Sequence, residues 1–191
     1  MIVREEHTGL DERALVIAAQ QGDRDAFKVL YDRYRDRVYN FIFYSIGEQL
    51  RAEDVLQIVF VKIFRGLPGF RFEASLATWI YRIALNECLN QQRRRGIHQV
   101  PFEALLGSDE EPVSAAADRQ HAEAERREIV HRAVTELSPK LRAVVALRYV
   151  DELSYEEIAD VLGCSAGTVA SRLNRALGQL EKRLRPLRRL L

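Results

Sequence analysis

The chain has 191 residues, and 47% of them are hydrophobic, so it can form one large domain or two small ones with real cores. Its formal net charge of +1 comes from 29 basic and 28 acidic residues, and this balance neither indicates nor excludes a nucleic-acid partner. The N-terminal residues 1–11 are polar, and no stretch approaches the roughly 20 apolar residues of a membrane span. We therefore expect a cytoplasmic protein that is not embedded in a membrane.

The sequence lacks the motifs of the common enzyme and metal-site classes. Its two cysteines, Cys88 and Cys164, lie far apart without a CxxC pair, which argues against a disulfide framework or a zinc site. The four histidines have no ligand spacing, and neither a phosphate-binding glycine loop nor a nucleophile motif occurs. His131 is expected at the surface of a helix. We expect no metal, no cofactor, no small-molecule substrate and no enzymatic activity.

Charge is segregated along the chain although the total is nearly zero. Residues 172–191 contain seven basic residues and one acidic residue. Residues 101–125 show the reverse, with seven acidic residues and one basic residue. A basic C-terminal segment of this kind is typical of a nucleic-acid-binding surface.

Helical periodicity dominates the sequence, and neither an alternating strand pattern nor a hairpin signal occurs. Four helices are predicted within residues 11–95. The first ends at Gly22, Asp23 or Asp25 can cap the second, and the third begins near Arg51. The face of the third helix that we expect to point inward carries Val55, Ile58, Val59, Lys62 and Ile63.

Residues 96–122 break the periodicity with two prolines, two glycines and an acidic cluster, and we interpret them as a mobile acidic linker. Helical spacing resumes after this segment. The sequence therefore predicts an all-α protein with two small helical domains, at residues 1–95 and 123–191, joined by a flexible acidic linker.

The most specific segment is a predicted helix-turn-helix in the second domain. Ser154 and Glu157 have the spacing of a capping box, and Gly163 can take the left-handed conformation that ends the first helix. Ala159 allows close approach of the two helices, and Ser165 can cap the second. A plain αα-hairpin, the less favoured alternative, would not need these features together. The apolar positions expected to point inward from the second helix are Val169, Leu173, Leu177 and Leu180.

A helix-turn-helix places the N-terminal outward residues of its second helix against base edges in the major groove. Arginine can bind guanine through two hydrogen bonds, whereas serine and threonine are less selective. The basic residues further along would contact phosphates or an acidic partner, or simply form a solvated helix end. The residues expected to bind duplex DNA are Ser165, Thr168, Ser171, Arg172 and Arg175.

The first domain contains aromatic residues interleaved with arginines: Phe70, Arg71, Phe72, Trp79, Tyr81 and Arg82. Aromatic faces flanked by cations are what single-stranded nucleic acid requires. Trp79, Arg82 and Asn86 also share one face of the predicted fourth helix. Composition alone favours the alternative, in which Phe70 and Trp79 are core residues.

Both domains resemble one family. The segments 53–57 (EDVLQ), 60–62 (FVK), 70–71 (FR) and 78–86 (TWIYRIALN) resemble region 2 of bacterial sigma factors. The segments 137–139 (LSP), 147–149 (LRY), 153–159 (LSYEEIA) and 167–173 (GTVASRL) resemble region 4. A compact chain with only a linker between the two regions resembles the extracytoplasmic-function (ECF) subfamily of the sigma-70 family.

The resemblance implies an alternative sigma factor that binds core RNA polymerase, directs it to −10/−35 promoters and helps to melt the DNA. The residues implied in docking on the β′ clamp helices are Asp54, Val55, Gln57 and Phe60. Those implied in capturing the melted −10 strand are Arg71, Phe72, Ser75, Trp79, Arg82 and Asn86. Asn86 matches the position that lines a pocket for a flipped-out base, where a tight fit offsets the cost of unstacking.

The resemblance also implies that region 4 reads the −35 element beside the β flap, that the linker threads through polymerase, and that an anti-sigma factor controls the protein. Two positions depart from the family pattern. Ile58-Val59 replaces a common polar pair, and Ala170 stands where many members carry arginine. The alternative is a conventional helix-turn-helix regulator, which would bind duplex DNA without polymerase.

Overall fold

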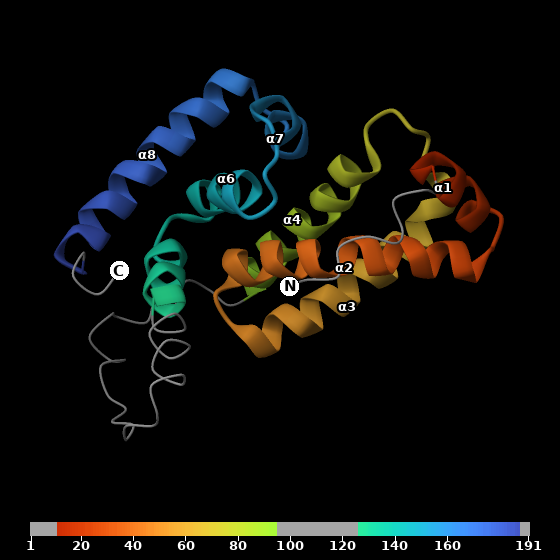
Figure 1. The fold of residues 1–191 in the computed structure, drawn as a ribbon, viewed down its shortest axis with the longest axis horizontal. Helices are drawn as coiled ribbons and strands as arrows, with labels where there is room; N and C mark the ends of the chain where they lie inside the picture. Colours follow the sequence, from red (N-terminus) through yellow and green to blue (C-terminus); the bar gives the residue numbers. More distant parts are fainter. Residues whose placement is uncertain (1–10, 95–125, 188–191) are drawn as a thin grey trace, which may run out of the picture.

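The computed structural model describes residues 11–94 and 126–187, and within these ranges every regular element is helical (Figure 1). The all-α prediction is therefore confirmed, whereas the predicted linker lies outside the described residues. The first range contains α1 (Glu12–Gln20), α2 (Arg24–Ile46), α3 (Gln49–Gly66), a 3₁₀ turn (Leu67–Gly69) and α4 (Leu76–Arg94). The second contains a helix over residues 126–135, then α6 (Pro139–Tyr149), α7 (Tyr155–Leu162), α8 (Ala166–Leu184) and a 3₁₀ turn (Arg185–Leu187).

The turn between α1 and α2 follows the sequence prediction. Gly22 has a φ of 94°, a conformation that costs glycine little because it has no Cβ. The Asp23 carboxylate accepts hydrogen bonds from the backbone N–H groups of Asp25 (2.9 Å) and Ala26 (3.0 Å). Asp23, rather than Asp25, is therefore the residue that caps α2.

The inward face of α3 differs in part from the prediction. Val55, Val59 and Ile63 are buried as expected, but Ile58 and Lys62 are exposed. Residues 55, 59 and 63 are four apart in the sequence, so their side chains lie on one side of the helix. The side chains of residues 58 and 62 are displaced around the helix axis, toward solvent. Lys62 forms an ion pair with Glu87 of α4, which brings a charged side chain to the edge of the core.

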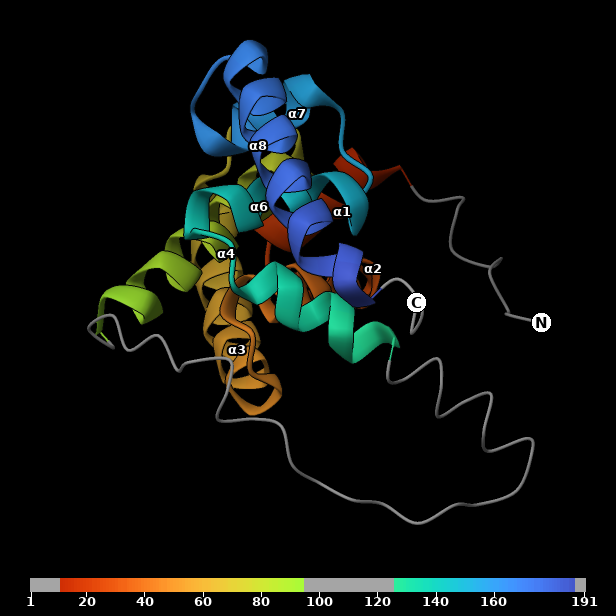
Figure 2. The same cartoon turned by 90° about the vertical axis from the view of Figure 1, so that its left-hand side faces the viewer.

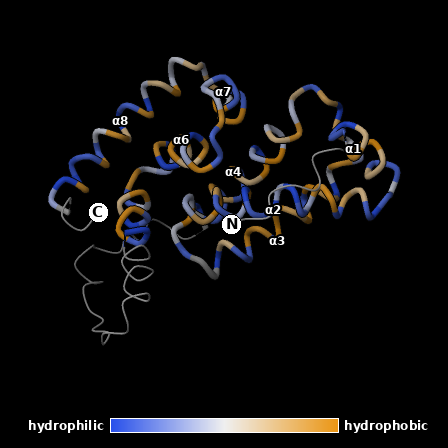
Figure 3. The backbone as a smooth tube through the Cα atoms, viewed as in Figure 1, coloured by the Kyte–Doolittle hydropathy of each residue, from blue (hydrophilic) through white to orange (hydrophobic). Residues whose placement is uncertain are grey.

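α8 shows a similar one-residue correction. Val169, Leu173 and Leu180 are buried as predicted, but the fourth inward position is Ala176, since Leu177 is 40% exposed. The series 169, 173, 176 and 180 keeps to one face at 3.6 residues per turn. In Figure 3 hydrophobic and hydrophilic residues alternate along α8 in step with this period.

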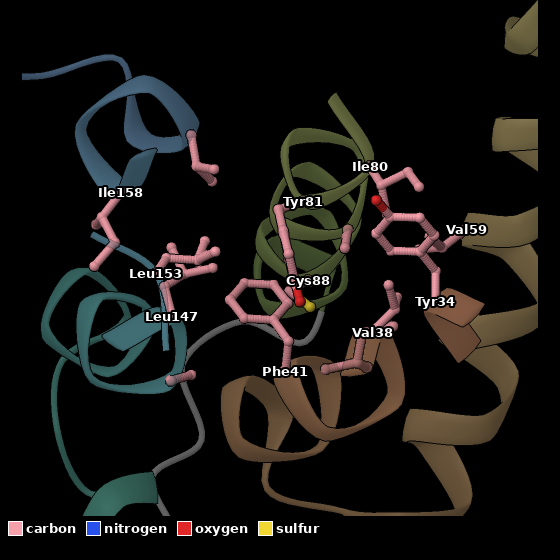
Figure 4. Packing of buried hydrophobic residues seen from close by; sticks show 14 of the residues in the cluster. Tyr34, Val38, Phe41, Val59, Ile80, Tyr81, Cys88, Leu147, Leu153 and Ile158 are labelled. Carbon is pink, nitrogen blue, oxygen red and sulfur yellow. The ribbon is translucent and has the colours of Figure 1, made fainter. Parts of the chain in front are cut away.

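The two halves of the chain share one hydrophobic core. α6 packs against both α8 and α2, and α7 packs against α4, as Figure 1 and the rotated view in Figure 2 both show. Figure 4 shows Leu147 and Leu153 from the second half facing Phe41 and Tyr81 from the first. None of the helices in the described ranges has the length and apolar character needed to cross a bilayer.

Candidate nucleic-acid interface

The predicted helix-turn-helix is formed by α7 and α8. The Ser154 side chain accepts a hydrogen bond from the Glu157 N–H (3.2 Å), and the Glu157 carboxylate accepts one from the Ser154 N–H (2.8 Å). Hydrogen bonding to Ser154, chiefly to its backbone N–H, holds the pKa of the Glu157 carboxyl below its usual value. Gly163 ends α7 with a φ of 61°, and the backbone turns directly into α8. The capping box and the glycine turn are both confirmed.

The five residues expected to bind duplex DNA lie in the first three turns of α8 or just before them. Ser165 caps the helix by accepting a hydrogen bond from the Thr168 N–H at 3.2 Å. Ser171 and Arg175 are exposed, and the Arg175 guanidinium donates to the Ser171 hydroxyl at 3.1 Å. Arg172 is half-buried, and its Nη1 lies 3.7 Å from the Cys164 sulfur. Ser171 of α8 therefore orients Arg175, and Cys164 of the turn orients Arg172. These two arginines are the side chains most able to contact bases.

The side of α4 that carries Trp79, Arg82 and Asn86 lies at the edge of the core. Arg82 and Asn86 are exposed, and Trp79 is half-buried. The indole lies against Gly66, where a Cβ would come within 3.1 Å of its Cζ2 atom, and 5.2 Å from the Phe70 ring. The sequence left open whether Trp79 and Phe70 were core residues, and the structure places Phe70 in the core and Trp79 at its edge.

The loop before α4 presents further candidates around a surface cavity of about 320 Å³. Phe72 has a φ of 59°, and the Arg13 guanidinium of α1 lies 4.4 Å from the centre of its ring. The Ser75 hydroxyl accepts from the Thr78 N–H at 3.0 Å, and so caps α4. Phe72, Ser75 and Arg13 line the cavity, whereas Asn86 does not. Arg71 is exposed in the same loop.

Arg82 contacts the helix-turn-helix directly. Its Nε and Nη2 atoms donate to the backbone carbonyl of Asp160, in the last turn of α7, at 2.9 and 2.6 Å. Arg82, one of the residues expected at the −10 strand, therefore joins α4 to the first helix of the helix-turn-helix.

Comparison with known proteins identifies the family. Sigma-70 region 2 matches residues 30–97, and Sigma-70 region 4 matches residues 127–180. The ECF RNA polymerase sigma-E factor of Haemophilus influenzae is 33% identical over 186 residues, covering 93% of this chain and 97% of that protein. The sigma-E factor of Escherichia coli K12 is 35% identical over 93% of this chain and 96% of its own length. This chain is an ECF sigma factor of the sigma-70 family.

Solved structures share the fold of this sigma factor. CnrH, solved in complex with the cytosolic domain of CnrY, superposes with a TM-score of 0.69 at 24% identity, covering 92% of this chain and 97% of its own. RpoE of Bartonella quintana, solved with the anti-sigma factor NepR, gives a TM-score of 0.64 at 23% identity, covering 83% and 96%. As an ECF sigma factor, the protein binds core RNA polymerase and directs it to promoters.

The residues of the sigma factor expected to dock on polymerase divide into two groups. Asp54 and Gln57 are exposed on α3. Val55 and Phe60 lie in the core, at 2% and 7% exposure, where a partner cannot reach them in this conformation. Other apolar side chains on α3 are exposed instead: Ile58 (37%), Val61 (48%) and Phe64 (54%). Burial therefore decides which side chains of α3 a partner can reach in this conformation.

The prediction that His131 lies at the surface was wrong. His131 is 7% exposed, and its ring stacks on Phe43 of α2 with 4.1 Å between ring centres. Burial lowers the pKa of His131, because the charged form would lose its hydration. Position on a helix could not reveal this contact, since it depends on α2 lying beside the helix over residues 126–135.

Both cysteines of the sigma factor are free thiols. Cys88 is buried on α4, and burial raises the pKa of its thiol to about 12.

Arg13 is a candidate site residue that the sequence analysis did not identify. Its only sequence signal is its charge, and its place beside Phe72 follows from the packing of α1 on the loop.

Proposed function

We propose that this sigma factor divides promoter recognition between two surfaces. The loop before α4 and the exposed side of α4 would bind the melted −10 strand through Arg71, Phe72, Ser75, Trp79, Arg82 and Asn86. The N-terminal half of α8 would enter the major groove of the −35 element through Ser165, Thr168, Ser171, Arg172 and Arg175. The observation that carries the proposal is the pair of capped helices around Gly163, which presents these α8 residues outward on a rigid support.

The test is run-off transcription with core RNA polymerase on promoter fragments from the source genome, with and without the protein. We expect specific transcripts only when the protein is added. Duplex binding without polymerase, and no transcripts, would instead favour a conventional helix-turn-helix regulator.

Because polymerase supplies the chemistry of transcription, we infer that the chain itself catalyses no reaction. We also infer that it acts in the cytoplasm, where RNA polymerase works.

Within this assay, single substitutions separate the two surfaces. Asn86→Ala should reduce open-complex formation while polymerase binding persists, and Asn90→Ala, also exposed on α4, is the matched control.

Arg172→Ala should weaken −35 binding by roughly 1–3 kcal/mol and relax selection at one base pair. Asn174→Ala, exposed on the same helix, should leave both unchanged. A uniform loss over all sequences would identify Arg172 as a phosphate contact.

For polymerase docking, we propose the exposed side of α3, where Asp54 and Gln57 lie close to the apolar Ile58 and Val61. Burial of such apolar area is the usual driving force for association. Ile58→Glu should weaken binding to core polymerase in a pull-down or titration. Ile17→Glu on α1 is a close match, because Ile17 is exposed to a similar extent (40% against 37%). Equal effects of the two changes would remove α3 from the proposed surface.

We also infer control by an anti-sigma factor that covers the DNA-binding surfaces, as the family resemblance implies. Bartonella quintana RpoE, which shares this fold, was solved bound to such a partner. A pull-down from the source organism should recover a protein that abolishes the run-off transcripts when added back. Recovery of polymerase subunits alone would argue against this form of control.

A further inference from the structure

Two side chains of α1 contact the segment that leads into α4. α1 packs against the 3₁₀ turn Leu67–Gly69, which is followed by the loop before α4, residues 70–75 (Figure 1). This loop carries three of the residues proposed to bind the melted −10 strand: Arg71, Phe72 and Ser75. None of the proposed DNA-binding residues lies on α1, so its contacts with the loop have no role in the function described above.

Gln20, the last residue of α1, holds the start of this loop. Its Nε2 atom donates to the carbonyl of Leu67 at 3.0 Å and to the carbonyl of Phe70 at 2.8 Å. A primary amide has two N–H donors, so both are used on backbone acceptors of one short segment. The Leu67 carbonyl also accepts from the Phe70 N–H at 3.0 Å. Gln20 therefore fixes both ends of the turn against α1.

Phe70 passes this restraint on to two of the proposed strand-binding rings. The centre of its buried ring lies 4.9 Å from that of Phe72 and 5.2 Å from that of Trp79. Because close-packed side chains have no free space between them, a shift of Phe70 displaces its neighbours. Gln20 therefore acts on Phe72 and Trp79 through Phe70.

Arg13, in the first turn of α1, holds the middle of the loop. Its guanidinium carbon lies 4.4 Å from the centre of the Phe72 ring, within the range of a cation–π contact. Phe72 has a φ of 59°, which is strained for a residue with a Cβ and persists only where surrounding contacts hold it. Arg13 and the Phe70 ring supply such contacts. Arg13 and Phe72 also line the same surface cavity of about 320 Å³.

We propose that α1 holds the loop before α4 in its strand-binding shape before DNA arrives, with Gln20 and Arg13 as positioning residues that touch no nucleotide. The proposal rests on the strand-binding role proposed for the loop. A loop that is already ordered loses less conformational entropy on binding, so more of its contact energy appears as affinity. Without the contacts from α1, the strained Phe72 backbone would relax, and binding would first have to restore it.

Hydrogen exchange in the free full-length protein, followed by NMR, tests this positioning without DNA. Gln20→Met keeps the length of the side chain and removes both donors. The Phe70 amide, which donates to the Leu67 carbonyl, should then exchange roughly five- to thirtyfold faster, because the turn loses a hydrogen-bond partner. The Cys164 amide, which is hydrogen-bonded within the helix-turn-helix, is the internal reference and should not change. Gln21→Met, at the exposed neighbouring glutamine, is the matched control. Equal acceleration of both amides, or of neither, would overturn the positioning role.

The effect on promoter opening is measured in the polymerase complex, at a promoter that the wild type transcribes. Gln20→Met should slow open-complex formation roughly five- to thirtyfold while binding to core polymerase stays equal, whereas Gln21→Met should change neither. Normal opening by a Gln20→Met protein whose loop exchanges faster would overturn the link between loop order and strand capture. If the wild type gives no transcripts, the proposed function fails instead, and the exchange measurement still decides whether α1 holds the loop.

Arg13→Gln separates positioning from direct contact with the strand. A positioning role predicts slower opening with the salt dependence of promoter affinity unchanged. Loss of a phosphate contact would instead reduce the slope of log affinity against log salt by about 0.7, and that result would overturn the positioning role of Arg13. Arg24→Gln, at an exposed arginine in the first turn of α2, is the matched control and should leave both opening and slope unchanged.

Discussion

Burial raises the pKa of the Asp151 carboxyl group far enough to matter near neutral pH. Loss of hydration raises the pKa of Asp151 from 3.8 to about 6, while the Tyr81 hydrogen bond and Arg37 act in the opposite direction. Its Oδ2 atom is buried without a hydrogen-bond partner in the described structure. The ionised form is therefore tolerated rather than favoured in the folded protein.

The sign of the pH dependence follows from this shift. Because the folded-state pKa lies above the unfolded value, the contribution of Asp151 to stability is fully present below pH 4 and is lost as the pH rises through about 6. Asp151→Asn cannot ionise, and its amide oxygen can still accept from Tyr81. The free energy of unfolding of the variant, relative to wild type, should rise by about 2–3 kcal/mol between pH 4 and pH 7.5. A difference that stays constant over this range in urea titrations would contradict the assignment.

Glu152, the next residue, has a φ of 57°. A residue with a Cβ is strained in this left-handed conformation, whereas glycine adopts it freely. Glu152→Gly should therefore raise the free energy of unfolding by about 1 kcal/mol, measured from the urea midpoint. Glu152→Ala is the control, because it removes the carboxylate and keeps the strained Cβ. Equal gains from both changes would attribute the effect to charge.

At the scale of elements, the caps of α7 and α8 decide whether the helix-turn-helix holds its shape. Ser154 and Ser165 each accept a hydrogen bond from the third amide of the helix that follows. Both helices begin beside a tight turn, so few other groups could satisfy these donors. The caps therefore fix where α8 begins, and with it which side chains its first turns present outward.

Ser165 is both a cap and a candidate DNA contact, and two substitutions separate these roles. Ser165→Ala should lower the free energy of unfolding by about 1 kcal/mol, because the Thr168 N–H loses its acceptor. Ser165→Asn should restore stability, since asparagine is an equally good cap. If Ser165 also touches DNA, −35 affinity in a fluorescence titration will change in Ser165→Asn although stability does not. Equal destabilisation by both substitutions would show that the cap contributes little.

At the scale of the whole molecule, the core runs without a break from region 2 into region 4. Proteins with one shared core usually unfold in a single transition. Trp79, the only tryptophan, reports on region 2, whereas circular dichroism reports on all helices. Because the core is shared, we expect both signals to give the same urea midpoint.

Leu147→Ala tests this coupling across the interface. Leu147 is fully buried on α6, and its loss should cost about 2–5 kcal/mol. The tryptophan midpoint should fall together with the circular dichroism midpoint, although the substitution lies in region 4. Leu177→Ala, at the exposed leucine of α8, should shift neither by much. A fall in the circular dichroism midpoint alone would mean that the two regions unfold independently.

The sequence by itself determined the local features of this sigma factor. The helices, a cap of α2 at Asp23 or Asp25, the capping box of Ser154 and Glu157, and the turn at Gly163 were all predictable, since each depends on residues within one or two turns. The family was predictable too, because short motifs in both regions carry it. These signals are local or compositional, so they can be recognised without knowing which helices pack against the segments that carry them.

Only the tertiary structure decided which residues face solvent at the boundaries between elements. Ile58 is exposed while His131 and Phe60 are buried, and each outcome depends on a helix distant in the sequence. Arg13 reaches Phe72, and Arg82 reaches Asp160, for the same reason. Residues that lie tens of positions apart meet only when their helices pack, and the periodicity of one helix does not say which partner covers it.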